Sequence, residues 1–196
     1  MEDFHLLSQF TLNLRWLMSQ KEQNPSEWGK TLEKMSRGYF SHVRAIGLVF
    51  EAKPTPAEVA ALADLTGHEA EELLSVPLYG REDSVRRLNF HYLLDALPKG
   101  EGQVAAKMIG ITPSQLSRWK GGVEKPRTSN ARKLLRFHGI DPDTDLDKVP
   151  LFLSMEPVSG YQQKKWVADR LMEMPANQMA AIYPALKKML RSDEDH

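Results

Sequence analysis

The sequence contains no cysteine among its 196 residues. Disulfide frameworks, thiolate zinc sites and thiol nucleophiles are therefore excluded, and the composition fits a reducing compartment. The first ten residues, MEDFHLLSQF, are acidic and contain neither a basic segment nor a long apolar run, so we expect neither a signal peptide nor a membrane span. The sequence thus predicts a cytoplasmic protein.

Strand signals are also scarce, because no run of alternating β-branched residues is bounded by turn pairs. Apolar residues instead recur at spacings of three and four along the chain, which is typical of amphipathic helices. Hydrophobic residues make up 41% and charged residues 27% of the sequence, so the chain is apolar enough to fold. We therefore predict an all-α protein.

Motifs for catalysis and metal binding are missing as well. The sequence has no phosphate-binding glycine loop, no nucleophile elbow and no pair of carboxylates in a catalytic frame. Its six histidines fall in no metal-ligand spacing: His5, His42, His68, His91, His138 and His196. We therefore expect no enzymatic activity, no catalytic residues, no metal and no cofactor.

Charge is balanced over the whole chain, with 26 basic and 26 acidic residues, but it is unevenly distributed. Residues 1–76 carry 7 basic and 11 acidic side chains, and residues 139–196 carry 7 and 10. Residues 81–138 carry 12 basic and 5 acidic side chains, a net charge of +7. Because cations release counterions from a phosphate backbone, we expect double-stranded DNA to bind this middle segment.

Two pairs of segments indicate an internal repeat. Leu12–Met18 matches Leu88–Leu94 in the pattern Leu-Asn-apolar-x-aromatic-Leu-apolar, at an offset of 76. Lys53–Thr55 matches Lys125–Arg127, each followed by a helical stretch that ends at a glycine, at an offset of 72. The difference of four residues is expected around Ile46–Ala52, in a loop between the third and fourth helices. We interpret the chain as two copies of one small helical domain.

The second copy, residues 81–150, has the clearer helix signals. Asp83 or Ser84 is expected to cap its first helix, and residues 101–108 are expected to form the second. Gly110 suits the left-handed backbone of a tight turn. Residues expected to pack in the second helix are Val104, Ala105 and Met108.

Two further helices follow in this copy. Thr112 is expected to cap the third helix, in which Pro113 suits the first turn and Leu116 and Trp119 face inward. The fourth is expected at residues 130–138, capped by Thr128 or Ser129, with its basic side chains solvated.

The segment from Ala106 through Gly110 to Trp119, followed by Gly122, resembles the helix-turn-helix of Cro/cI-type, or XRE-like, transcriptional regulators. Residues 84–140 carry the resemblance well, and residues 8–75 carry it more faintly. The resemblance implies two lambda-repressor-like domains in tandem and a bacterial or phage DNA-binding protein. The acidic residue frequent near the end of the family's third helix is replaced here by Lys120.

In such a motif the third helix, here residues 112–120, enters the major groove with its first residues nearest the bases. Glutamine pairs with adenine and arginine with guanine through two contacts each, and hydroxyls reach bases or phosphates. Candidate base-reading residues are Thr112, Ser114, Gln115, Ser117 and Arg118. Candidate phosphate-binding residues, which set register without reading sequence, are Lys120, Lys125, Arg127 and Thr128.

The first copy, residues 1–78, is degenerate. We expect its second helix at residues 26–32, capped by Asn24 or Ser26, and its third to begin at Ser36 with Phe40 and Val43 inward. Acidic surroundings favour a structural or partner-binding role over direct DNA reading, although both remain open. The candidate DNA contacts are Arg37, Tyr39, Ser41, His42 and Arg44.

Residues 155–192 are expected to form a C-terminal helical hairpin. Ser159 would cap its first helix, Pro175 would open the second, and Pro184 would kink or split that second helix. The apolar stripe either packs on its own chain or forms a homodimer seam, and the sequence favours neither. The candidate seam residues are Trp166, Met179, Ile182, Leu186 and Met189.

Together these features predict a sequence-specific DNA-binding transcriptional regulator, with repression the direction implied by the resemblance. The alternative is a protein-interaction module, such as an antitoxin or assembly factor, in which the helix-turn-helix is mainly structural. The two differ in salt dependence, since binding by the basic segment weakens steeply with salt while an apolar interface need not.

Overall fold

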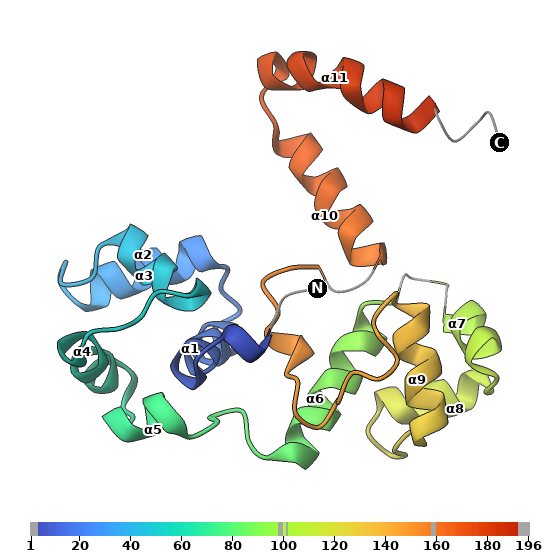
Figure 1. Ribbon diagram of the computed structural model, residues 1–196, viewed down its shortest axis with the longest axis horizontal. Coiled ribbons are helices and arrows are strands. Elements are labelled where there is room, and N and C mark those ends of the chain that lie inside the picture. Colours follow the sequence, from blue (N-terminus) through green and yellow to red (C-terminus); the bar gives the residue numbers. More distant parts are fainter. Residues whose placement is uncertain (1–3, 98–99, 101, 158–159, 192–196) are drawn as a thin grey trace.

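The computed structural model describes residues 4–97, 100, 102–157 and 160–191 (Figure 1). All regular secondary structure in these residues is helical, which confirms the predicted all-α class. The helices surround two separate hydrophobic cores, and two more helices extend from the C-terminal side (Figure 1).

The first five α-helices form the N-terminal bundle. They are α1 (Gln9–Gln20), α2 (Pro25–Met35), α3 (His42–Phe50), α4 (Pro56–Thr66) and α5 (Ala70–Ser75). Asn24 and Thr55 cap α2 and α4, and in both helices a glutamate three residues later completes a capping box. The core of this bundle includes the fully buried Phe10, Leu14, Trp28, Leu48 and Leu62.

The next four α-helices form the central bundle. They are α6 (Glu82–Asp95), α7 (Gly102–Ile109), α8 (Pro113–Lys120) and α9 (Thr128–Phe137). The short helix η2 (Leu151–Leu153) closes this bundle. A short N-terminal helix, η1 (Phe4–Leu6), adds Phe4 to the same core. The central members of this core include Leu93, Ala106, Ile109, Leu134 and Leu151.

A buried asparagine holds the connecting chain against the first helix of each bundle. The Asn13 amide donates to the carbonyls of Leu73 and Val76 at 3.0 and 2.8 Å. The Asn89 amide donates to those of Leu146 and Val149 at 2.9 and 2.7 Å. Each asparagine oxygen also accepts one backbone N–H further along its own connector. Because buried backbone groups must be paired, Asn13 fixes the end of α5 and the chain after it, and Asn89 fixes the irregular segment that leads into η2 (Leu151–Leu153).

Helix α1 packs against both cores. Phe10 and Leu14 belong to the N-terminal core, whereas Leu12 belongs to the central one. On the same side Trp16 makes edge contacts with Tyr79 and Phe152, at centroid distances of 6.5 and 6.0 Å. The two bundles therefore share α1 as a common wall.

The only fully buried arginine among the described residues, Arg15, ties the bundles together. Its Nε donates to the Val49 carbonyl at 2.7 Å, and Nη1 donates to the Leu153 carbonyl at 3.2 Å. Val49 lies at the end of α3 in the N-terminal bundle, and Leu153 lies in η2 of the central bundle. One guanidinium thus bonds main-chain groups of both bundles.

Several expected boundaries in the N-terminal bundle are wrong. Helix α3 is capped by Ser41, not begun at Ser36, so Val43 is 78% exposed instead of buried. The Ser36 hydroxyl instead accepts from the Phe40 N–H, in the turn after α2. The extra residues also do not lie after the third helix: α2 has 11 residues where α7 has 8, and the turn before Ser41 is the longer one.

The central bundle also differs in detail from expectation. Helix α6 begins at Glu82 after Arg81, and α9 begins at Thr128 after Arg127, so neither has the expected side-chain cap. Val104 and Met108 of α7 are exposed, whereas Ala105 is buried as expected, together with Ala106 and Ile109. The two sets lie on different faces of one helix, and the smaller side chains allow a closer helix contact.

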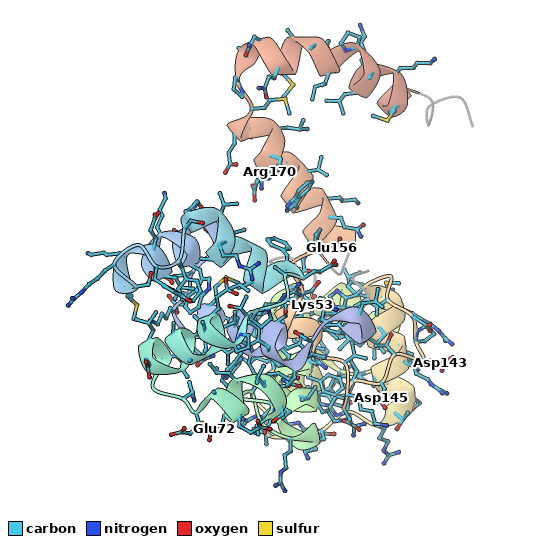
Figure 2. The ribbon with its side chains drawn as sticks, turned by 60° about the vertical axis from the view of Figure 1, so that its left-hand side comes forward. Lys53, Glu72, Asp143, Asp145, Glu156 and Arg170 are labelled. Atoms are coloured by element: carbon cyan, nitrogen blue, oxygen red, sulfur yellow. The ribbon has the colours of Figure 1, made fainter. Side chains whose placement is uncertain are left out.

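The C-terminal residues form an arm of two helices, α10 (Gly160–Glu173) and α11 (Ala176–Arg191). Beyond Glu156 the arm leaves the bundles, and Arg170 lies well away from them (Figure 2). The two helices diverge at a corner and do not pack side by side as a hairpin would (Figure 1). Pro184 lies within the continuous helix α11, and the expected cap Ser159 falls outside the described residues.

Candidate nucleic-acid interface

Helices α7 and α8 meet at the tight turn expected from the sequence. Gly110 has a φ of 78°, which an L side chain rarely adopts, so glycine is required there. The Thr112 hydroxyl accepts from the Gln115 N–H at 3.2 Å, and Pro113 is the first residue of α8. The Lys133 ammonium donates to the Ile109 carbonyl at 3.0 Å, which satisfies one free acceptor at the end of α7.

The inner face of α8 is anchored as predicted. Leu116 and Trp119 are 7% and 4% exposed and belong to the core of the central bundle. Because α8 has only 8 residues, this burial and the Thr112 cap supply most of its stability. The predicted base-reading residues Thr112, Ser114, Ser117 and Arg118 are exposed, and Gln115 is half-buried.

A carboxylate that sequence reasoning missed holds two of these side chains. The Gln115 amide donates to Glu124 Oε1 at 3.2 Å, and Arg118 Nε lies 3.4 Å from Glu124 Oε2. Glu124 sits in the turn between α8 and α9, outside the helix expected to carry the DNA contacts. It is the one acidic residue of the basic stretch 121–138, and that isolation was the available signal. Both long candidate base readers therefore contact Glu124 in the chain without DNA.

The predicted phosphate-binding residues have different surroundings. Lys120 Nζ lies 2.6 Å from a carboxylate oxygen of Asp95 in α6. Lys120, which stands where XRE-like regulators often have an acidic residue, thus has an acidic partner of its own. Lys125 and Arg127 are exposed beside the turn, and Thr128 is the first residue of α9. All four residues therefore lie at or beyond the C-terminal end of α8, on the surface next to the base-reading candidates.

The candidate contacts of the N-terminal bundle do not share one helix face. Arg37 and Tyr39 lie in the turn before α3, and Ser41 is the cap of that helix. The Arg44 guanidinium binds both Glu58 oxygens at 2.6 and 2.8 Å. This hydrogen-bonded pairing lowers the pKa of Glu58 to about 2. His42 begins α3, and the exposed side chain that follows it is Val43.

A comparison with protein families places a known motif over α7, α8 and α9. Residues 103–144 match the Helix-turn-helix family model. The match supports an XRE-like motif of the kind found in DNA-binding transcription regulators, a class that is not typically enzymatic. Comparisons with curated proteins and with solved structures found no match.

Membrane-spanning helices and metal clusters are both absent from the residues that the structure describes. None of the helices in these residues is both long and apolar enough to cross a membrane. Within the same residues no three histidine or acidic side chains are grouped so that they would hold a metal ion.

Proposed function

We propose that the chain is a sequence-specific transcriptional regulator, and a repressor, that reads the major groove of DNA with α8. The observation that carries this proposal is the exposed face of a capped helix whose other face, Leu116 and Trp119, is buried. That helix lies inside the segment that matches the helix-turn-helix family. The proposal places the protein in the cytoplasm of a bacterium or in a phage-infected cell.

In this proposal α8 uses two kinds of contact. Gln115 and Arg118 read adenine and guanine through paired hydrogen bonds, while Ser114, Ser117 and Thr112 reach bases or phosphates. Glu124 contacts the two longer side chains and favours the rotamers that lie beside it, which lowers the entropy cost of binding. Lys125, Arg127 and Thr128 bind phosphates beside α8, and Lys120 does so if its contact with Asp95 opens.

The N-terminal bundle is proposed to be a second copy of the same domain that no longer reads DNA. Matching buried asparagines, Asn13 and Asn89, support the shared ancestry of the two bundles. In the first turn of α3 the exposed side chain is Val43, and the Arg44 guanidinium is hydrogen-bonded to Glu58. An apolar side chain at the first reading position favours a protein partner over a base edge.

We further propose that the arm forms a homodimer. The described part of the chain leaves much of the arm's apolar surface exposed, since Trp166 is 51% and Met189 is 60% exposed. Met179, Ile182 and Leu186 are half-buried on the same helix as Met189. A dimer would present two copies of α8 to a palindromic site. An Ile182→Glu variant is then expected to sediment as a monomer while its far-ultraviolet circular dichroism stays unchanged.

The test of the regulator proposal is selection from random DNA duplexes at low and moderate salt. We expect the purified protein to enrich one motif, and the double variant Gln115→Ala with Arg118→Ala to lose it. A double variant of exposed residues on the arm, Gln178→Ala with Lys188→Ala, is the matched control and should keep it. Failure of the unaltered protein to enrich any motif, even at low salt, would contradict the proposal.

A protein-interaction module, such as an antitoxin or assembly factor, is the second candidate. The exposed apolar side chains of the N-terminal bundle favour it, notably Tyr39, Val43 and Phe50. The affinity for a partner bound through such a surface should change little with salt. The affinity for DNA should fall with salt, and the fall is steeper the more phosphates the protein neutralises. A flat salt profile for a captured protein, together with no DNA motif, would favour this candidate.

A further inference from the structure

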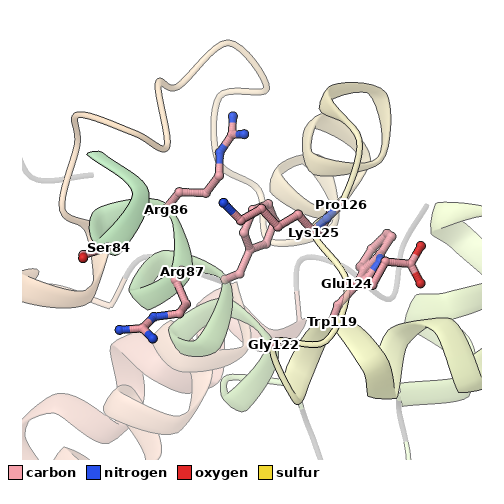
Figure 3. A pocket seen from close by; sticks show the side chains of 9 residues that line it. Ser84, Arg86, Arg87, Trp119, Gly122, Glu124, Lys125 and Pro126 are labelled. Carbon is pink, nitrogen blue, oxygen red and sulfur yellow. The ribbon is translucent and has the colours of Figure 1, made fainter. Parts of the chain in front are cut away.

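A cavity of about 270 Å³ lies between α6 and the turn that joins α8 to α9 (Figure 3). A second hollow of about 430 Å³ adjoins it and shares Arg87, Trp119 and Gly122 as lining residues. Pockets for small ligands usually start at about 300 Å³, so the first cavity suits a ligand of one ring or a little more. None of the residues proposed to read bases lines it.

Three basic side chains and one acidic side chain, Glu124, line the cavity. Arg86 and Arg87 extend from α6, and Lys125 reaches across from the turn (Figure 3). Arg86 is already neutralised by Asp147 at 2.6 Å. Arg87 is exposed and forms no ion pair with another described residue, so its guanidinium can receive an anion in a planar, two-bond geometry.

The floor of the cavity is apolar. Phe90, Trp119 and Pro126 line it, and all three are buried. The indole Nε1–H of Trp119 is buried too, and has no hydrogen-bond acceptor among the described residues. A buried donor without a partner costs free energy, which an acceptor brought in by a ligand would recover. A DNA phosphate gains nothing from contact with an apolar floor, whereas an aromatic ring buries apolar surface against it.

We propose that this cavity binds a small aromatic carboxylate as an effector. The ring lies against Phe90 and Pro126, the carboxylate pairs with Arg87, and Trp119 forms the wall between them. The ligand carries one negative charge because Arg87 is a rim cation with no ion-pair partner among the described residues, and its ring is single because of the volume of the cavity.

The cavity is connected directly to the proposed base readers. Glu124 lines it and at the same time holds Gln115 and Arg118. A bound carboxylate repels the Glu124 carboxylate and competes with phosphates for Arg87 and Lys125. Both effects lower DNA affinity, so the ligand acts as an inducer. This regulatory part rests on the proposed DNA-binding function, whereas the binding site itself does not.

The first experiment measures ligand binding without DNA, by calorimetry on the full chain. Benzoate and phenylacetate are the probes, benzyl alcohol is the neutral control, and inorganic phosphate is the anion without a ring. We expect saturable binding of a carboxylate probe, at least tenfold weaker binding to Arg87→Gln, and unchanged binding to the matched variant Arg136→Gln on α9. The Trp119 indole N–H signal in a nitrogen–proton spectrum should shift on binding.

Three results would overturn the site: no carboxylate probe binds, Arg87→Gln binds as well as the unaltered chain, or inorganic phosphate binds as tightly as benzoate. The second experiment uses a DNA duplex from the selection and compares its affinity with and without saturating probe. Allosteric coupling is typically fivefold or more, so we expect at least a fivefold loss that Arg87→Gln abolishes. Equal DNA affinity with and without a tightly bound probe would refute the inducer role alone. A failure of the protein to bind DNA at all would refute the proposed function but not the ligand-binding site.

Discussion

Replacing Asn89 by alanine should destabilise the central bundle severely. The Asn89 side chain is fully buried, and its removal leaves the carbonyls of Leu146 and Val149 and the N–H of Phe152 without their partner. Each buried polar group left unpaired costs about 1–3 kcal/mol. Because the connector can relax, we expect a total of about 3–5 kcal/mol, a large part of the stability of an ordinary domain.

Urea unfolding followed by far-ultraviolet circular dichroism measures this destabilisation. With a slope of about 1–3 kcal/mol per molar for a domain of this size, the midpoint should fall by about 2 M. Asn177→Ala in the exposed part of α11 is the matched control and should change the free energy of unfolding by less than about 0.5 kcal/mol. A cost below about 1 kcal/mol for Asn89→Ala would refute the argument that one side chain orders the connector.

Three further perturbations test other local arguments. Thr112→Ala should cost about 1 kcal/mol in thermal unfolding and Thr112→Ser much less, because the hydroxyl is the cap of α8. The pKa of Glu58 is lowered to about 2 by its hydrogen bonds with Arg44, so the free energy of unfolding should fall as the pH drops from about 4.5 to about 2. The urea midpoint of Glu58→Gln should not show this dependence on pH. Burial lowers the pKa of His138 from 6.5 to about 4, so the unfolded chain binds this proton at a higher pH than the folded chain does. The free energy of unfolding should therefore fall as the pH drops from about 6.5 to about 4. The His138→Gln variant should lack this decrease.

Helix α8 was predictable because its determinants are local. The cap Thr112, the proline after it and the glycine of the preceding turn all act within a few residues, and the structure confirms each. The contact between Glu124 and Arg118 was not predictable in the same way. It depends on how the chain turns back after Gly121–Gly122, which periodicity does not reveal.

The register of α3 failed for a different reason. Ser36 and Ser41 both have the side chain of a helix cap, and sequence alone gives them equal weight. Between residues 43 and 50 most side chains are apolar, so no stripe identifies the buried face. The burial of Leu48 in the core of the N-terminal bundle decides the outcome, and that is a tertiary effect. In α7 the bulkier Val104 was likewise expected inside, although close packing favours alanine there.

The position of Arg15 bears on how the two bundles act together. Its guanidinium bonds the Val49 carbonyl at the end of α3 and the Leu153 carbonyl beside the central core. Removing that charge would leave carbonyls of both bundles unpaired, so the cost of separating them includes buried polar groups as well as apolar surface. The bundles are therefore expected to move as one body. If α8 binds DNA as proposed, a partner bound at Val43 would then be held at a fixed place relative to that DNA.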